Sequence, residues 1–348
     1  MSAAMTQKHK NIPIFIPHLG CPHDCVFCNQ KKISGHGKFD PNTVIPEIEA
    51  ALSTMREGEM PEIAFFGGSF TGIERELMIS LLDIAEGYVR GGRVSGIRMS
   101  TRPDYISEEI LDVLSNYTVS AIELGLQSFD ERVLALSERG HTPEQSVNAC
   151  RAIVRRGIPL VGQMMIGLPG SDVYAERKTA EMIVSLGCVA ARVYPTVVFR
   201  NTRLCAMAED GEYLPITDED AIARTKEVLK ILIPAGITLL RIGLCSNEDI
   251  RDPETVHSGA AHPAIGELCI GEYYYELIRE SLLYVTECCD VLSVFVPQSD
   301  VGKAVGQRRR NSSRLYNEFC REKKQFKKIK IIGDASLSDY RIRIETNT

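Results

Sequence analysis

The sequence predicts an α/β fold built around a parallel sheet. Apolar runs rich in β-branched and aromatic residues alternate with helical patterns, and six such strand–helix units follow one another in the first 200 residues. Alternation of this kind implies parallel strands with the helices outside. Six units fit a partial barrel better than a closed eightfold one, so we expect a partial (β/α)6 TIM-like barrel with a small α+β C-terminal extension.

Each predicted strand of this barrel is a short apolar run. The second ends at Gly67-Gly68, the third ends in Thr101-Arg102-Pro103, and the fifth is followed by Gly-Leu-Pro-Gly. In a barrel of this kind the loops after the strands carry the chemistry, so the polar residues at these ends are of interest. The six strands are expected at residues 11–17, 62–66, 96–100, 120–126, 159–166 and 189–198.

The intervening helices are predicted from their patterns and from start signals. Asp40 and Ser107 stand where N-cap residues are preferred, and Thr142 precedes a proline in the first turn of its helix. These signals fix where three of the helices begin. The helices are expected at residues 41–55, 74–89, 107–114, 143–156 and 172–186.

Beyond residue 200 the alternation loosens. A helix, a strand, a polar loop and a second helix are expected at residues 217–233, 237–242, 245–264 and 268–285. Three strand-like runs and a long basic helix follow, at residues 291–296, 328–332, 341–345 and 307–324. We therefore expect a core of residues 1–200, a barrel-covering region of residues 201–289 and a small basic α+β unit of residues 290–348.

The composition is that of a soluble globular enzyme. Of the 348 residues, 44 % are hydrophobic and 25 % are charged. No apolar run approaches the roughly 20 residues that span a bilayer. The polar N-terminus does not read as a signal peptide. We expect a cytoplasmic protein without membrane contact, and in that reducing compartment we do not expect the eleven cysteines to form structural disulfides.

The charge of the chain is unevenly distributed. Residues 301–348 hold 13 Lys or Arg and 5 Asp or Glu, a local charge of +8 in a chain whose net charge is −6. A basic tail on an acidic body indicates an anionic partner, with nucleic acid the first candidate. The alternative is a solvated basic helix without a partner.

Three cysteines are crowded into eight residues. Cys21, Cys25 and Cys28 have the spacing CxxxCxxC in the loop after the first strand. Three thiolates so close together suit a cuboidal iron–sulfur cluster, and because such a cluster takes four ligands, one iron stays open to a further ligand. Structural zinc is the alternative, with a nearby histidine as fourth ligand. The candidate histidines are His18, His23 and His36. We interpret the other eight cysteines as small, mostly buried apolar residues.

This loop resembles that of the radical S-adenosylmethionine (SAM) superfamily, in which CxxxCxxC follows the first strand and an aromatic residue, here Phe27, precedes the last cysteine. The resemblance implies a 4Fe–4S cluster on Cys21, Cys25 and Cys28, with the open iron chelating SAM. It also implies reductive cleavage of SAM to a 5′-deoxyadenosyl radical that abstracts hydrogen, and a reductase or flavodoxin- or ferredoxin-type protein as electron donor. No second site of this type is present, so we predict a single cluster.

Further motifs resemble the radical SAM domain of the elongator catalytic subunit family, whose members modify the wobble uridine of tRNA. They are Gly67-Gly68-Ser69-Phe70, the Ser100–Tyr105 segment with Thr101, Glu123–Ser128, Arg139-Gly-His-Thr142 and Gly162–Gly170. The resemblance covers residues 11–198 well. It implies SAM contacts from Gly67, Gly68, Ser69 and Thr101, ribose binding by Gln127, carboxylate pairing by Arg139, and an adenine pocket near Phe27, Met165 or Tyr194.

Two features leave the reaction open. Members of the elongator family carry an acetyltransferase domain after the radical SAM part, whereas this sequence shows no acetyl-CoA pyrophosphate loop. The same motifs are similar, less closely, to oxygen-independent coproporphyrinogen oxidase, which would imply a small-molecule substrate. We therefore expect radical SAM chemistry on tRNA or another RNA. The alternatives are a small porphyrin-like or cofactor precursor, or an RNA-binding iron–sulfur protein without SAM chemistry.

The basic tail contains a segment similar to the helix–GxxG–helix core of KH RNA-binding domains, whose loop clamps a nucleic-acid backbone. Gly306 fits the pattern, and Arg309 stands where the second glycine belongs. The side chains expected to contact phosphate are Lys303, Arg308, Arg309, Arg310 and Arg314.

The polar loop past the barrel is a further candidate for covering its mouth, where it could supply a substrate contact or a proton donor. Its polar residues are Glu254, His257, His262 and Glu267.

Overall fold

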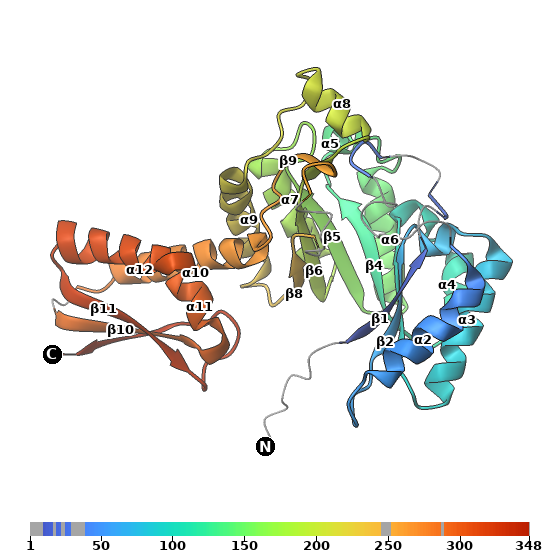
Figure 1. Ribbon diagram of the computed structural model, residues 1–348, viewed down its shortest axis with the longest axis horizontal. Coiled ribbons are helices and arrows are strands. Elements are labelled where there is room, and N and C mark those ends of the chain that lie inside the picture. Colours follow the sequence, from blue (N-terminus) through green and yellow to red (C-terminus); the bar gives the residue numbers. More distant parts are fainter. Residues whose placement is uncertain are drawn as a thin grey trace.

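A computed structural model describes residues 10–16, 19–21, 25–28, 39–244, 252–286 and 289–347. It shows an α/β core and a smaller C-terminal unit, with helix α10 between them (Figure 1). The core is a curled parallel sheet with helices outside, which confirms the predicted fold class. Among the described helices, none combines the length and the apolar character needed to cross a bilayer.

The sheet of the core has seven parallel strands, one more than the six units expected. The additional strand, β8, joins the edge of the sheet beside β6, because helix α9 completes a sixth strand–helix–strand crossover after residue 200. In order across the sheet, the strands are β1 (Asn11–Ile16), β2 (Glu62–Gly67), β3 (Gly96–Thr101), β4 (Val119–Gln127), β5 (Leu160–Ile166), β6 (Ala190–Pro195) and β8 (Thr238–Ile242).

The helices of the core begin where the cap residues predict. Ser107 Oγ accepts a hydrogen bond from Ile110 N, and Thr142 forms a capping box with Gln145. Asp40 caps a 3-10 turn that leads into the first helix. The helices are α2 (Val44–Ser53), α3 (Arg75–Arg90), α4 (Glu108–Leu114), α6 (Pro143–Arg155), α7 (Val173–Ser185) and α9 (Asp218–Leu232).

The two faces of the sheet carry different side chains because successive residues of a strand point to opposite sides. On the face toward the helices, apolar side chains form the main hydrophobic core, to which β1 contributes Ile12, Ile14 and Ile16. The other face is polar at mid-height, where Arg98 pairs with Glu62 at 3.0 Å and Arg192 pairs with Glu123 at 2.8 Å. The interior of the barrel is therefore lined by buried ion pairs together with a small separate apolar cluster of Ala121, Val161 and Ala190.

A group of short elements lies near the carboxyl ends of the strands (Figure 1). Several of them form in segments that were expected to be irregular. The predicted strand at 189–198 is two strands, because β7 separates from β6 and pairs with part of the predicted polar loop, which forms β9. These elements are α5 (Glu131–Leu136), β7 (Val197–Phe199), α8 (Arg203–Glu209) and β9 (Val256–Gly259).

The C-terminal unit is a small sheet covered by helices. Its central strand β10 pairs in parallel with β11 and antiparallel with β12. Helix α10 supplies buried residues to this unit and to the main core, so it joins the two. The elements are α10 (Ile265–Leu283), β10 (Cys289–Pro297), α11 (Val301–Val305), α12 (Arg310–Leu315), β11 (Phe326–Asp334) and β12 (Arg343–Asn347).

The long basic helix expected at residues 307–324 is present from Arg310 to Glu322 and differs from the expectation in its first turn. A turn at Gln307–Arg309 precedes α12, and Arg308 and Arg309 adopt left-handed conformations with φ of 50° and 61°. The helix then widens into a π-helical stretch at Tyr316–Glu322. Just after the turn, the amide of Asn311 donates to the Gly271 carbonyl oxygen at 2.8 Å and so attaches the start of α12 to α10, a contact that local propensity does not reveal.

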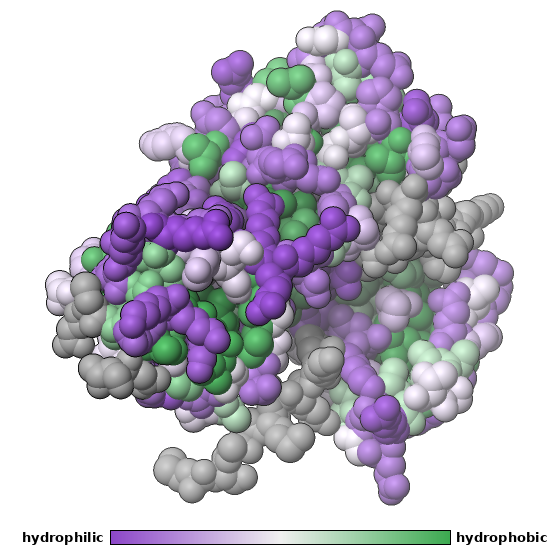
Figure 2. All heavy atoms as spheres, turned by 60° about the vertical axis from the view of Figure 1, so that its left-hand side comes forward, coloured by the Kyte–Doolittle hydropathy of each residue, from purple (hydrophilic) through white to green (hydrophobic). Residues whose placement is uncertain are grey.

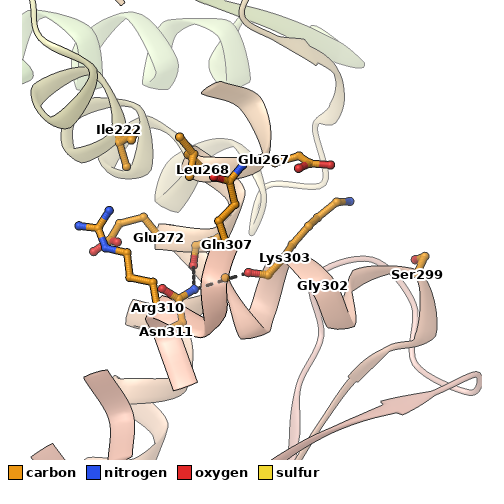
Figure 3. Close-up of a pocket in the computed structure, with 12 residues that line it drawn as sticks. Ile222, Glu267, Leu268, Glu272, Ser299, Gly302, Lys303, Gln307, Arg310 and Asn311 are labelled. Carbon is orange, nitrogen blue, oxygen red and sulfur yellow. Dashed lines mark hydrogen bonds between the residues drawn. The ribbon is translucent and has the colours of Figure 1, made fainter. Parts of the chain in front are cut away.

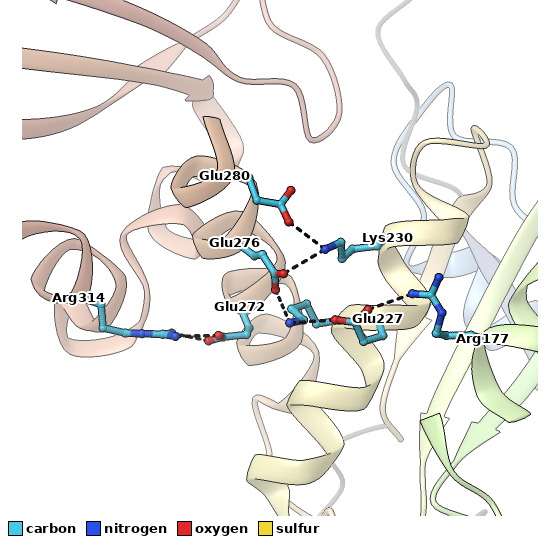
Figure 4. A network of polar contacts seen from close by, with 8 residues as sticks. Arg177, Glu227, Lys230, Glu272, Glu276, Glu280 and Arg314 are labelled. Atoms are coloured by element: carbon cyan, nitrogen blue, oxygen red, sulfur yellow. Dashed lines mark hydrogen bonds and ion pairs between the residues drawn. The ribbon is translucent and has the colours of Figure 1, made fainter. Parts of the chain in front are cut away.

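Ion pairs along α10 fix the orientation of the C-terminal unit (Figure 4). Glu276 binds Lys226 and Lys230 of α9, whereas Glu272 holds Arg314 of α12 at 2.6 Å. Half-exposed pairs of this kind contribute modestly to stability, yet a network that joins three helices restricts their relative rotation. The division of the chain near residues 200 and 290 into separate domains stays a prediction.

The buried hydrogen bond between Tyr274 Oη and Asp300 Oδ2, 2.7 Å long, is expected to stabilise the C-terminal unit. Replacing Tyr274 by Phe leaves a buried carboxylate oxygen without this donor. We expect the free energy of unfolding in urea to fall by about 1–3 kcal/mol. Tyr284→Phe, at a side chain that is 85 % exposed, is the matched control and should be neutral. Equal stability of the two variants would contradict the assignment.

Candidate active site

The cysteine loop is held against the end of β2 by contacts that only glycine permits. Gly68 N donates to the Ile16 carbonyl oxygen at 2.8 Å. A Cβ at Gly68 would lie 2.1 Å from the Leu19 carbonyl oxygen, and one at Gly20 would lie 2.2 Å from that of Ser69. Gly67 and Gly68, which the resemblance implies as SAM contacts, let the loop and the strand end approach each other closely.

The far side of the loop is fixed by two other segments. Val26 N donates to the Ser137 carbonyl oxygen after α5, and Val26 O accepts from Leu204 N of α8 at 2.8 Å. Cys28 N donates to the Cys25 carbonyl oxygen at 2.9 Å, which turns the chain between these two cysteines. His18, His23 and His36, the candidate ligands in the zinc alternative, lie outside the described residues.

Two arginines bring positive charge to the cysteines. Arg139 Nη1 donates to Cys25 Sγ at 3.4 Å, and Arg139 itself is buried. Burial raises the pKa of the Cys21 thiol, while Arg139 and Arg102 act in the opposite direction. Cationic neighbours stabilise thiolates, and thiolates are the form that binds metal. The site is therefore suited to ligating an anionic or metal-containing group.

Near the end of β4, the side chains of Arg139 and Gln127 pack against Gly125, which has no side chain of its own. Arg139 Nη2 donates to the Gly125 carbonyl oxygen at 2.8 Å. A Cβ at Gly125 would lie 2.7 Å from Arg139 Nη2 and 3.1 Å from Gln127 Nε2, so any larger residue would displace both side chains. The strand register shifts here, and Gln127 takes a left-handed φ of 63°. Strain of this kind at a strand end is characteristic of binding sites.

Several buried polar atoms around this loop have no hydrogen-bond partner among the described residues. They include Gln127 Oε1, Arg139 Nε, Arg102 Nη1 and both ring nitrogens of His141. Because buried polar groups are nearly always satisfied, such a concentration indicates a site whose bonds are completed by a bound group. A polar ligand beside the cysteines, such as an amino acid and a ribose, fits these donors and acceptors.

A second layer of groups supports Arg102 and Ser69. Asp104 accepts two hydrogen bonds from Arg102, at 2.9 and 2.8 Å, and so fixes the plane of its guanidinium. Thr101 Oγ1 lies 2.7 Å from Ser69 Oγ and 2.6 Å from Thr71 Oγ1, which ties the end of β3 to the turn after β2. Thr101, predicted as a SAM contact, is thus engaged within the protein and supports Ser69.

The three residues predicted for an adenine pocket lie on neighbouring elements. Phe27 and Met165 pack against the same apolar cluster of Val133, Leu168 and Ala175. Tyr194 stands beside Met165 in the register of β5 and β6. Burial raises the pKa of Tyr194, whose neighbours in the barrel interior are Arg192 and Glu123.

Sequence reasoning assigned no role to four residues that the structure places in or near the site. Gly125 is one, and its signal was a glycine inside an otherwise apolar strand. Arg102, Asp104 and His141 belong to the Ser100–Tyr105 and Arg139–Thr142 motifs, but nothing in the sequence distinguished them from the other residues of these motifs. Burial lowers the pKa of His141 to about 3, and Arg139 adds to this effect.

The basic C-terminal residues divide into two groups. Arg314 stacks on the Tyr275 ring at 3.4 Å and binds Glu272, and Lys303 pairs with Asp300 at 2.7 Å. These two side chains are thus engaged internally, which the local sequence could not reveal. The turn that follows Gly306, here called the basic turn, exposes the other group of cations, Arg308, Arg309 and Arg310. Hydrophilic side chains cover much of the face that Figure 2 brings forward.

A polar cavity of about 250 Å³ lies beside this turn (Figure 3). Lys303, Gln307 and Arg310 approach it from the α11–α12 segment, and Glu267 and Glu272 approach it from α10. Glu267 therefore lines this cavity. Of the other loop residues, His257 lies on β9, His262 accepts from Ala264 N at Nδ1, and Glu254 is exposed.

The chain matches two family models in succession. Residues 15–183 match the radical SAM superfamily, and residues 189–276 match the radical SAM C-terminal domain. An uncharacterized protein of Methanocaldococcus jannaschii is 30 % identical over 66 % of this chain and 73 % of its own length. The tRNA uridine(34) acetyltransferase of Methanocaldococcus infernus is 29 % identical over 43 % of this chain, which spans 28 % of that protein.

A solved structure has the same fold. Archaeal Elp3 of Methanocaldococcus infernus, with its N-terminus deleted, superposes with a TM-score of 0.61 at 21 % identity, covering 79 % of this chain and 63 % of that one. The parallel half-barrel, the cysteine loop at the end of its first strand and these matches agree. The chain belongs to the radical SAM superfamily and is a radical SAM enzyme, and the family implies a 4Fe–4S cluster and SAM.

The low pKa of His141 can be measured directly. We expect its ring to stay neutral between pH 8 and pH 4 in the iron-free folded protein, because burial disfavours the charged form. Unfolded histidine has a pKa of about 6.5, so His141 destabilises the fold progressively as the pH falls from 6.5 toward 3. The measurement is the histidine Cε1 chemical shift against pH, assigned with His141→Gln. A midpoint near 6.5 in the folded protein would disprove it.

Proposed function

We propose that this enzyme uses reductive cleavage of SAM to start radical chemistry on an RNA substrate, with tRNA the first candidate. The observation that carries the SAM part is the group of unpartnered polar atoms on Gln127, Arg139 and His141 beside the cysteine loop. When bound, the reduced cluster and SAM supply a carbon-centred radical that abstracts hydrogen from the substrate.

We assign Cys21, Cys25 and Cys28 as the cluster ligands. Two of them lie in the electrostatic field of Arg139 and Arg102, which favours thiolates. Arg139, which contacts both Cys25 and the end of β4, would then lie beside the cluster. Arg139 suits the SAM carboxylate because a guanidinium presents paired donors, and its Nε has no hydrogen-bond partner among the described residues. Gln127 Oε1, which has none among them either, suits a ribose hydroxyl.

The remaining SAM contacts are assigned from where the residues lie around the cysteine loop. The backbone at Gly67, Gly68 and Ser69 ends β2 next to the loop and suits the SAM amino group, with Thr101 holding Ser69 in place. Phe27 and Met165 suit the adenine because they share one apolar cluster, and Tyr194 extends that side of the barrel. A protein electron donor of the flavodoxin or ferredoxin type would have to reach the cysteine loop.

The RNA part of the proposal rests on the basic turn and on relatives. Arg308, Arg309 and Arg310 are exposed on a tight turn, next to a polar cavity that Lys303 and Gln307 line. Exposed arginines at a turn can contact phosphates without rearranging the fold. The acetyltransferase from Methanocaldococcus infernus is named for tRNA uridine 34, which makes tRNA the first RNA to test.

The first test measures 5′-deoxyadenosine and methionine by chromatography after anaerobic cluster reconstitution, with dithionite and SAM present. We expect both products from the wild type and a loss of at least about 100-fold in Cys28→Ala, because a missing thiolate ligand prevents assembly of the site. The matched control is Cys320→Ala, at a half-buried cysteine of the C-terminal unit, which should keep wild-type activity. A cluster that leaves SAM intact in the presence of RNA would contradict the SAM chemistry.

The second test measures tRNA binding as a function of salt. For R308A/R309A/R310A we expect weaker binding and a slope of log K against log[salt] that is smaller by about 2–3, because each lost phosphate contact removes roughly 0.7–0.9. The control K327A/K328A/K330A removes the same charge from exposed lysines of β11. Equal effects of both variants would show that the total positive charge of the unit, rather than the arginines of the turn, determines RNA binding. Unchanged binding in both variants would favour a small-molecule substrate.

A further inference from the structure

A second group of metal-ligating side chains lies outside the proposed SAM site. Cys205 and Glu209 stand one turn apart on α8, and His257 approaches from β9. Their ligand atoms, a thiol sulfur, a carboxylate oxygen and a ring nitrogen, all lie within 4.8 Å of one another. We propose that Cys205, Glu209 and His257 form a mononuclear site for a divalent metal of the Zn²⁺ class, independent of the iron–sulfur cluster.

The distances are close to those of a tetrahedral zinc site. Cys205 Sγ lies 3.6 Å from Glu209 Oε1, and His257 Nε2 lies 3.8 Å from the same oxygen. With metal–ligand bonds of about 2.0–2.3 Å, tetrahedral geometry places neighbouring ligand atoms roughly 3.4–3.6 Å apart. The two printed separations to Glu209 Oε1 thus lie within a few tenths of an ångström of this geometry, and a small side-chain adjustment would bring the sulfur and the ring nitrogen onto one ion.

The chemistry of the three ligands selects the metal. A thiolate and a carboxylate together carry two negative charges, which a divalent cation neutralises, and the neutral imidazole adds none. Sulfur with nitrogen and oxygen is the donor set of zinc rather than of calcium or magnesium, which take oxygen ligands. The site would therefore discriminate against the common alkaline-earth cations.

The surroundings orient two of these ligands before any metal binds. His257 Nδ1 lies 2.8 Å from Ser258 Oγ, and a hydrogen bond donated by that nitrogen leaves Nε2 as the free acceptor that a metal needs. Cys205 is buried, and its backbone N is bonded by Thr202, the N-cap residue of α8. Glu209 is exposed, so the fourth position of the metal faces solvent and would take water.

The site has a structural consequence for the cysteine loop. Leu204, next to Cys205, donates its backbone N–H to the Val26 carbonyl oxygen, and Val26, Val198, Leu204 and Cys205 share one apolar cluster. A metal bridging α8 and β9 would hold α8 in the position where it supports this loop. The chain separation between Cys205 and His257 makes this an effective cross-link, because a long loop is closed.

The test uses full-length protein with its iron–sulfur cluster reconstituted, exposed anaerobically to Zn²⁺ and then freed of loosely bound metal. Zinc is counted by mass spectrometry, and its ligands are read by X-ray absorption at the zinc edge. We expect about one zinc per chain with one sulfur near 2.3 Å and the rest nitrogen or oxygen near 2.0–2.1 Å.

Two variants and two matched controls assign the ligands. Cys205→Ser and His257→Ala should weaken zinc binding by more than tenfold, since even outer-shell changes cost 10–100-fold. Cys320→Ser and His262→Ala, at a cysteine and a histidine outside the group, should keep the zinc. A zinc bound by three sulfurs would place the ion on the CxxxCxxC loop and overturn the proposal. Absence of zinc in the wild type, or its retention in both ligand variants, would overturn it as well.

Discussion

The position of Arg139 is the constraint on which the rest of the candidate active site depends. Its guanidinium joins Cys25 Sγ to the Gly125 carbonyl oxygen and so connects the cysteine loop to the end of β4. This contact exists only because Gly125 has no Cβ. One buried cation therefore contributes to the electrostatics of the thiols and joins two segments about 100 residues apart.

The barrel brings these groups together because all seven strands run in one direction. The carboxyl ends of parallel strands meet at one edge of a sheet, and each contributes a loop to the same space. The cysteine loop, the Gly67-Gly68 turn, Arg102 and Gln127 come from four such ends. The C-terminal unit is joined to the core through α10, whose carboxylates bind lysines of α9 and an arginine of α12. These ion pairs keep the exposed basic turn in a fixed position beside the polar cavity.

Much of the fold was readable in the sequence because its signals are local. Strands that end at glycine or proline, helices that begin at Ser107 or Thr142, and the spacing of the three cysteines each involve a few consecutive residues. The errors lie where distant contacts override local pattern. The turn at Gln307–Arg309 delays the start of the expected basic helix, and β8 extends the sheet because α9 returns the chain to its edge.

The sequence by itself determined the fold class and the superfamily, because a short cysteine motif and a repeated strand–helix alternation suffice for these. Only the tertiary structure decided which cations face the thiols, which buried polar atoms lack partners, and which tail arginines are exposed. It also brought Cys205 and His257 together from segments about 50 residues apart. Such arrangements depend on contacts between distant elements, and packing of the whole chain, rather than local propensity, fixes those contacts.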